Sequence, residues 1–298
     1  MTPTTRPDRR RGAPWRRLAS ARAALAAAIL VLGLAGAGCV ELEQTIQVRP
    51  DGSGLVLSDL IFSEKMIAEM TSAGEDWETM KKDALPRMEE SGPGAAAALG
   101  EGVEFVSVEE IAGADRPTFR FTFRFDDVAR VRPNPMAPLA SEMPGADAGV
   151  DEQIRLSLER SGGSSVLSVK LFDEEELQQL AEDVAEQPAD DDAASEMASQ
   201  MEKGMMEMFK EMFDGFALRL SVETLGRIVE TNASFVEGSR VTLFDLDFGK
   251  LLDDPEALAR IGGDGQEQPS LLDLRAAFAE VEGVRIDLQS MVRIVFAE

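Results

Sequence analysis

Two side chains that often perform enzyme chemistry are absent from this chain, and a third occurs once. The sequence has no His and no Tyr, and Cys39 is its single Cys. Without His, the Ser-His-Asp and Cys-His mechanisms and the common zinc sites are excluded. Neither the phosphate-binding pattern G-x-x-x-x-G-K-[ST] nor the nucleophile pattern G-x-S-x-G is present. These absences favour a protein that is not an enzyme and that carries no cofactor.

Methionines form the most regular pattern of chemically soft side chains. Residues Ser195 to Phe213 predict a helix, in which five methionines fall within an arc of about 80° at 3.6 residues per turn: Met197, Met201, Met205, Met208 and Met212. Three interpretations are open: thioethers that fill gaps in a core, an adaptable groove for an apolar ligand or partner, or a Cu(I) site. No second ligand-rich segment supports the metal, so no metal site is predicted.

Four phenylalanines alternate along one predicted strand, Thr118 to Asp126. Because successive side chains of a strand point to opposite faces, all four rings share one face. One interpretation is packing beneath helices. The other is a cavity shared with the methionine helix, which would hold an acyl chain or a similar apolar ligand. Under the second interpretation the ligand would contact Phe119, Phe121, Phe123, Met201, Met205, Met208 and Met212.

Carboxylates are numerous, but their spacing does not define a site. Without its first 38 residues the chain has 54 acidic and 23 basic residues, a net charge near −31. Such a surface repels nucleic acid, so no nucleic-acid partner is expected, whereas a cationic protein partner is allowed. The stretch Asp51-Gly52-Ser53-Gly54 lacks the acid spacing of an EF-hand loop, and acidic groups such as Asp190 to Asp192 are dense but scattered. They are interpreted as solvated surface or as weak Ca²⁺ sites.

The N-terminus has the pattern of an export signal. Seven arginines precede an apolar run from Ala23 to Gly38, which is short for a membrane-spanning helix of about 20 residues. The run ends in Leu34-Ala35-Gly36-Ala37-Gly38-Cys39, which resembles the lipobox of bacterial lipoproteins. Gly36 stands where Leu is usual, so ordinary cleavage after Ala37 is the alternative. The resemblance implies a signal peptide over 1–38 and acyl chains such as palmitate on Cys39, which would anchor the protein to a membrane of the cell envelope on the periplasmic face or the cell surface.

The remaining pattern alternates strands with helices. Three hairpins are predicted over 40–62, 103–126 and 154–172, helices over 63–90, 173–186, 195–213 and 270–281, and a loop over 92–98. Further strands are predicted over 216–222, 227–230, 241–248, 284–288 and 291–296. Interleaved helices and hairpins favour an α+β fold, with one or more antiparallel, hairpin-rich sheets and packed helices.

Composition divides the chain after the signal peptide into three parts. Residues 39–131 form a hairpin–helix–hairpin module, and the Pro- and Ala-rich residues 132–151 read as a linker or a long surface loop. Residues 152–298 form a second α+β portion. The two portions form either two domains or one.

Two short stretches resemble a group of bacterial lipoproteins that includes the mycobacterial LppM-like proteins. One is Cys39-Val40 with the following strand and the turn Pro50-Asp51-Gly52-Ser53-Gly54. The other is Asn232 to Gly238 leading into a strand, where Leu243-Phe244 replace a Trp often seen in the group. The resemblance implies a compact sheet-and-helix ectodomain displayed from a membrane, without catalytic residues.

Together these patterns predict an exported, lipid-anchored and non-enzymatic binding module with an apolar pocket or groove. One alternative is a structural or assembly lipoprotein that binds an envelope protein through its acidic face. A carboxylate- or metal-dependent hydrolase is the third interpretation.

Overall fold

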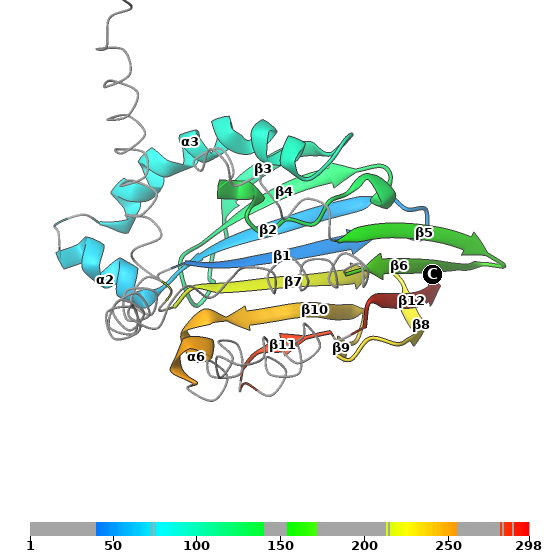
Figure 1. The fold of residues 1–298 in the computed structure, drawn as a ribbon. Helices are drawn as coiled ribbons and strands as arrows, with labels where there is room; N and C mark the ends of the chain where they lie inside the picture. Colours follow the sequence, from blue (N-terminus) through cyan, green and yellow to red (C-terminus); the bar gives the residue numbers. More distant parts are fainter. Residues whose placement is uncertain are drawn as a thin grey trace, which may run out of the picture.

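A computed structural model describes residues 40–72, 74, 76–139, 154–171, 213, 215–254, 281, 283–287 and 289–297 (Figure 1). The export signal, Cys39 and the methionine stripe from Met197 to Met212 lie outside the described residues, as do the helix predicted over 173–186 and nearly all of the one predicted over 270–281.

Eight strands of the described chain form a large sheet in the order β11-β10-β7-β1-β2-β4-β3, with β9 paired to β10. All of its neighbouring strands are antiparallel except β1 and β7, which run parallel with Leu42 beside Leu218. The strands are β1 (Val40–Val48), β2 (Gly54–Phe62), β3 (Glu104–Glu110), β4 (Thr118–Phe125), β7 (Ala217–Thr224), β9 (Val236–Glu237), β10 (Arg240–Asp247) and β11 (Arg285–Ile286).

A small antiparallel sheet has the order β5-β6-β12-β8. Its strands are β5 (Arg155–Ser161), β6 (Ser164–Lys170), β8 (Arg227–Thr231) and β12 (Met291–Ala297).

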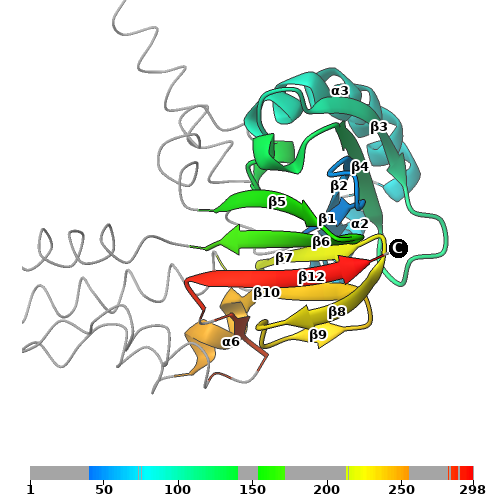
Figure 2. The same ribbon diagram turned by 90° about the vertical axis from the view of Figure 1, so that its right-hand side faces the viewer.

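The small sheet lies at the end of the molecule opposite α2, and Figure 2 views it from that end. The chain passes from β7 into β8 through Leu225 and Gly226. A Cβ atom at Gly226 would lie 2.4 Å from the carbonyl oxygen of Ala297, so this corner requires glycine. The predicted α+β class with hairpin-rich antiparallel sheets is confirmed.

Three α-helices lie in the described residues: α2 (Glu64–Ser72), α3 (Trp77–Ala98) and α6 (Phe248–Asp253), with two 3₁₀ turns, η1 (Val128–Arg130) and η2 (Ala137–Leu139). Gly74 lies between α2 and α3. Asp76 begins α3 as its N-cap, because its carboxylate accepts a 2.9 Å hydrogen bond from the amide of Thr79.

The loop predicted over 92–98 is wrong, because α3 continues through Pro93 to Ala98. Small residues permit this continuation. Gly92 lies directly on β3, where a Cβ atom would stand 2.6 Å from the ring of Phe105. Ala95 and Ala96 are buried on the same side. Gly92 therefore allows a close contact between helix and sheet, and the Gly-Pro pair does not end the helix.

The inner face of the large sheet carries two apolar clusters. The inter-sheet cluster lies between the two sheets and the C-terminal half of α3, and it includes Ile46, Phe121, Phe123, Leu220, Leu167 and Phe296. The α2–α3 cluster lies at the other end of the same face, and its buried members are Leu42, Leu60, Phe62 and Phe119. The four aligned phenylalanines of β4 are thus shared between two clusters.

The first part of the segment predicted as a linker packs against this inner face. Pro133, Asn134, Ala137 and Pro138 are buried, and η2 packs beside α3. Residues 133–135, 137 and 138 are therefore buried, whereas Arg132 is exposed. Residues 140–151 lie outside the described part.

The two predicted portions of the chain share one sheet. β7, from the second portion, pairs with β1 over eight residues from Glu41 opposite Ala217 to Val48 opposite Thr224. The inter-sheet cluster likewise contains residues of both portions.

Candidate apolar binding site

The floor of the α2–α3 cluster is made by adjacent strands of the large sheet. Leu42 of β1 lies opposite Leu60 of β2, which lies opposite Phe119 of β4. Phe62 extends the floor by one inward-facing position along β2. All four side chains are buried.

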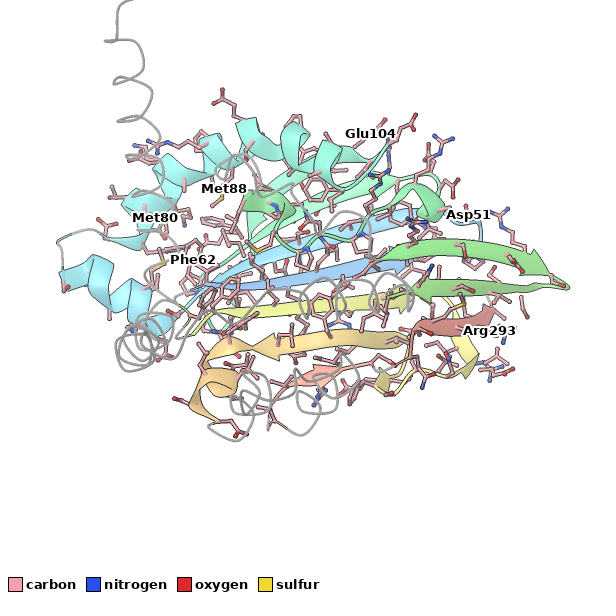
Figure 3. All side chains as sticks on the ribbon, viewed as in Figure 1. Asp51, Phe62, Met80, Met88, Glu104 and Arg293 are labelled. Carbon is pink, nitrogen blue, oxygen red and sulfur yellow. The ribbon has the colours of Figure 1, made fainter. Side chains whose placement is uncertain are left out.

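The roof of the cluster is made largely of partly buried side chains from helices. α2 contributes Met66 and Ile67, and α3 contributes Trp77, Met80 and Met88. In Figure 3, Met80 and Met88 lie between α3 and the sheet, with Phe62 nearby. Met136, Leu139, Phe216 and Leu218 close the sides. Thioether side chains are flexible and polarizable, so such a roof can repack around an inserted apolar group.

Three aromatic rings connect the roof to the floor. The indole of Trp77 stacks on Phe119, with centroids 5.3 Å apart and an interplanar angle of 27°. Its edge meets Phe62 at 5.4 Å, and Phe62 meets Phe119 edge-on at 5.8 Å. These offset and edge-to-face arrangements are favourable for aromatic pairs. They place Trp77 over the floor of the cluster.

A polar group fixes the orientation of the indole. Trp77 Nε1–H donates to Glu110 Oε1 at 2.8 Å, and Lys81 Nζ donates to the other oxygen of the same carboxylate at 2.8 Å. The bond from Lys81, and then the bond from Trp77, hold the pKa of Glu110 below its usual value. The same bond with Glu110, and then one with Glu78, raises the pKa of Lys81. The rim of the cluster is therefore an ion pair that stays charged at neutral pH.

A buried amide separates the two clusters. Gln44 Nε2 donates to Ser58 Oγ at 3.0 Å and to the carbonyl oxygen of Asn134 at 2.9 Å, and its Oε1 accepts the amide of Asn134 at 2.9 Å. Gln44 is fully buried and all three of these bonds are made inside the protein. The amide thus holds residues 132–139 across the sheet and forms a polar wall between the β1 and β2 residues of the two clusters, whereas Met88 and Val108 pack against both clusters.

The structure divides the residues that the sequence assigned to an apolar ligand. Phe119 lies in the α2–α3 cluster, whereas Phe121 and Phe123 lie in the inter-sheet cluster with 1% and 0% exposure. Met201, Met205, Met208 and Met212 lie outside the described residues. Ligand contact by these seven residues stays a prediction.

The roof residues Trp77, Met80 and Met88 lie within the helix predicted over 63–90, and the sequence pattern assigned them to no site. Their spacing of three and then eight residues is the signal that places them together. Nothing in the local pattern shows that this face meets Phe119, because the contact joins residues more than thirty positions apart in the chain.

Val40 connects this cluster to the predicted lipid anchor. It pairs in register with Phe62 and packs against the cluster. Cys39 is the residue directly before it. In the described residues no helix is long and apolar enough to cross a membrane.

The outer face of the large sheet carries a row of charges that are largely paired with one another. Arg219 contacts Asp245 at 3.0 Å and Glu43 at 3.2 Å, and Arg120 contacts Asp59 at 2.6 Å through a bidentate pair. Register places all five residues in one row across the sheet. This row gives no site for a metal, and within the described chain no three acidic or Cys side chains gather to hold one.

Comparisons with known proteins give little further information. No protein-family model matches the chain, and no curated protein matches it significantly. Among solved structures the chain is similar to the folded domain of LppM from Mycobacterium tuberculosis, determined by NMR. The likeness has 13% sequence identity and a TM-score of 0.26, and it covers 87% of this chain and 90% of that one. A TM-score this low supports no statement about the fold or the function of this chain.

Proposed function

We propose that this protein is an exported envelope lipoprotein, anchored through acylated Cys39, whose ectodomain binds an apolar ligand such as an acyl chain without performing catalysis. The ligand site is the α2–α3 cluster, entered between the floor residues and the helical roof. The single observation that carries the proposal is that four buried floor residues are covered by partly buried thioether and aromatic side chains from helices.

The packing around the roof supports this choice. Opening a binding site requires elements that separate from the core at low free energy. Within the described residues, α2 contacts α3 at only a small number of positions, whereas the longer strands of both sheets are paired along their lengths. An acyl chain inserted beneath the roof would replace the Met66, Met80 and Met88 contacts with similar apolar contacts, so burial of the ligand would drive binding.

The alternative of a protein partner on the acidic face is less well supported by the geometry. Its basis is the large negative charge of the chain. On the described outer face of the large sheet, however, Glu43, Asp59 and Asp245 already contact arginines of the same sheet. A cationic partner would have to compete with these internal pairs.

Photo-crosslinking of the full lipoprotein tests the proposal. A fatty acid with a diazirine near the end of its chain is added to the protein in vesicles, irradiated, and mapped by mass spectrometry. Crosslinks are expected on the floor, at Leu42, Leu60 or Phe119, and on Met80. Crosslinks confined to outward-facing side chains would contradict a site inside the cluster.

Two methionine variants provide a matched pair. Met80→Asp places a carboxylate in the roof and is expected to abolish crosslinking to the floor. Met291→Asp makes the same change at a half-exposed methionine of the small sheet and is expected to leave crosslinking unchanged. If folded Met80→Asp protein crosslinks as well as the unsubstituted protein, the ligand does not enter beneath α3.

A further inference from the structure

The end of the large sheet where β1 begins gathers several partly exposed aromatic and aliphatic side chains. Trp77 of α3 and Met66 and Ile67 of α2 lie on one side of Val40. On the other side, Phe216 precedes β7 and Phe248 begins α6, with ring centroids 5.3 Å apart. The amide of Phe248 donates to the carbonyl oxygen of Phe216 at 3.0 Å, which fixes the two rings beside each other.

Pairing places these groups at one end of the molecule. Val40 lies opposite Phe62, immediately before α2, and Glu41 lies opposite Ala217, immediately after Phe216. The far end of β10 reaches the same end, because Asp247 lies opposite Ala217 and α6 follows at once. Figure 1 shows α2 and α6 together at the end away from the small sheet.

The charges at this end are arranged in pairs. Arg116 forms a bidentate pair with Glu41, Lys81 pairs with Glu110, and Lys250 lies 3.5 Å from Asp247. The strongly negative chain would be repelled by a bilayer that contains anionic lipid. Pairing lowers the repulsion from Glu41, Glu110 and Asp247, although the exposed carboxylates of α2 and the start of α3 still add to it.

We propose that this end is a membrane-seating surface: Met66, Ile67, Trp77, Phe216 and Phe248 rest on the interface of the bilayer that holds the acylated Cys39. The inference rests on the proposed lipid anchor. A bilayer is the expected partner of this surface because Val40, the first residue of β1, directly follows Cys39. No tether therefore separates the anchor from the fold. Of these side chains, Trp77 is the aromatic one with a polar end, the type that is favoured at membrane interfaces.

The seating fixes the orientation of the ectodomain. β1 spans nine residues, so Val48 lies about 26 Å from Val40 at about 3.3 Å per residue. The turn after β1 and the small sheet therefore point away from the membrane. The α2 end of the α2–α3 cluster lies nearest the leaflet, which makes that leaflet the source of an acyl chain.

Spin labels on the full lipoprotein in vesicles of phosphatidylcholine and phosphatidylglycerol test this orientation. Ala68→Cys labels the exposed side of α2, and Ser157→Cys labels the exposed face of β5 as a control. Collisions are measured with oxygen, which concentrates in the bilayer, and with a nickel chelate, which stays in water. The Ala68 label is expected to lose most of its nickel collisions and keep those with oxygen, whereas the Ser157 label keeps its nickel collisions.

Equal nickel collisions at the two labels would overturn the seating surface. Protection of the Ala68 label from both reagents would also overturn it, because another part of the chain would then cover this end. Neither result depends on ligand uptake. If the Ala68 label is shielded from nickel as expected but the fatty acid forms no crosslinks to the cluster floor, only the proposed function is contradicted.

Discussion

The two apolar clusters of the inner face differ in the elements that close them. The inter-sheet cluster is closed mainly by strands whose backbones are hydrogen-bonded on both sheets, and its 23 buried members outnumber the 10 partly buried side chains packed against them. The α2–α3 cluster has only four buried members and a roof of partly buried helical side chains. A strand-closed cluster is suited to stability, whereas a helix-roofed cluster with methionines is suited to rearrangement. The same sheet thus carries a rigid end and an adaptable end.

The largest expected effect is a difference in the free energy of unfolding when one side chain of each cluster is shortened to Ala. Phe121→Ala in the inter-sheet cluster is expected to lower the free energy of unfolding by about 3–5 kcal/mol, because strands on both sides cannot collapse into the cavity. Met80→Ala in the roof is expected to lower it by less than about 2 kcal/mol, because a partly exposed site loses less contact. Urea unfolding of both variants measures the difference. Equal losses would remove the distinction between the clusters.

Two glycine substitutions in α3 test how closely this helix packs on β3. Gly92→Ala is expected to destabilise the protein by about 1–3 kcal/mol, because its Cβ would overlap the Phe105 ring. Gly94→Ala has no atom within 4 Å of its Cβ and is expected to stabilise the helix by about 0.5–1 kcal/mol. Thermal unfolding of the two variants gives the signs. Stabilisation by both would contradict close packing of α3 on β3.

The polar wall between the clusters is tested at Gln44. Gln44→Ala leaves the buried amide and carbonyl of Asn134 without these partners, a loss of about 1–3 kcal/mol. Hydrogen exchange at the Asn134 amide is expected to accelerate. Gln47→Ala, on the outer face of the same strand, removes one part-buried bond to Glu223 and serves as the control. Unchanged exchange at Asn134 would show that residues 132–139 are held by apolar packing alone.

The smallest expected effect concerns the charged rim of the roof. Bonds from Lys81 and then Trp77 lower the pKa of Glu110, so its carboxylate binds protons less readily in the folded than in the unfolded chain. The contribution of Glu110 to the free energy of unfolding is therefore present above the ordinary carboxyl pKa of 4.5. It is lost as the pH falls through the lowered pKa. The difference in unfolding free energy between the unsubstituted protein and Glu110→Gln is expected to close on acidification below that range. A difference independent of pH would exclude this linkage.

Local patterns were sufficient to predict most of the strands. The alternation along β1 and β2 and the turn at Pro50 to Gly54 set a two-strand hairpin, and the Gly162-Gly163 pair did the same between β5 and β6. The parallel pairing of β1 with β7 could not be predicted, because it joins segments 176 positions apart and no turn connects them.

The candidate site was predictable only in part, for the same reason. Phe119 was predicted from its strand, whereas Trp77, Met80 and Met88 lie in a predicted helix that was assigned to no site. The contact between Phe119 and these helical residues depends on how α3 crosses the sheet. The position of α3 depends in turn on the close contact of Gly92 with Phe105 and on residues 132–139, which Gln44 binds. Both features consist of Gly, Pro and Asn, which by themselves indicate loops.

Native mass spectrometry on the full lipoprotein, gently extracted from its own membrane, tests the central claim most directly. The denatured mass is expected to exceed that of the 39–298 polypeptide by a set of acyl chains. The native mass is expected to show a further apolar molecule that leaves on denaturation and is absent from the Met80→Asp variant. A denatured mass equal to the bare polypeptide would contradict the anchor, and a native mass without a further molecule would contradict the binding site in the α2–α3 cluster.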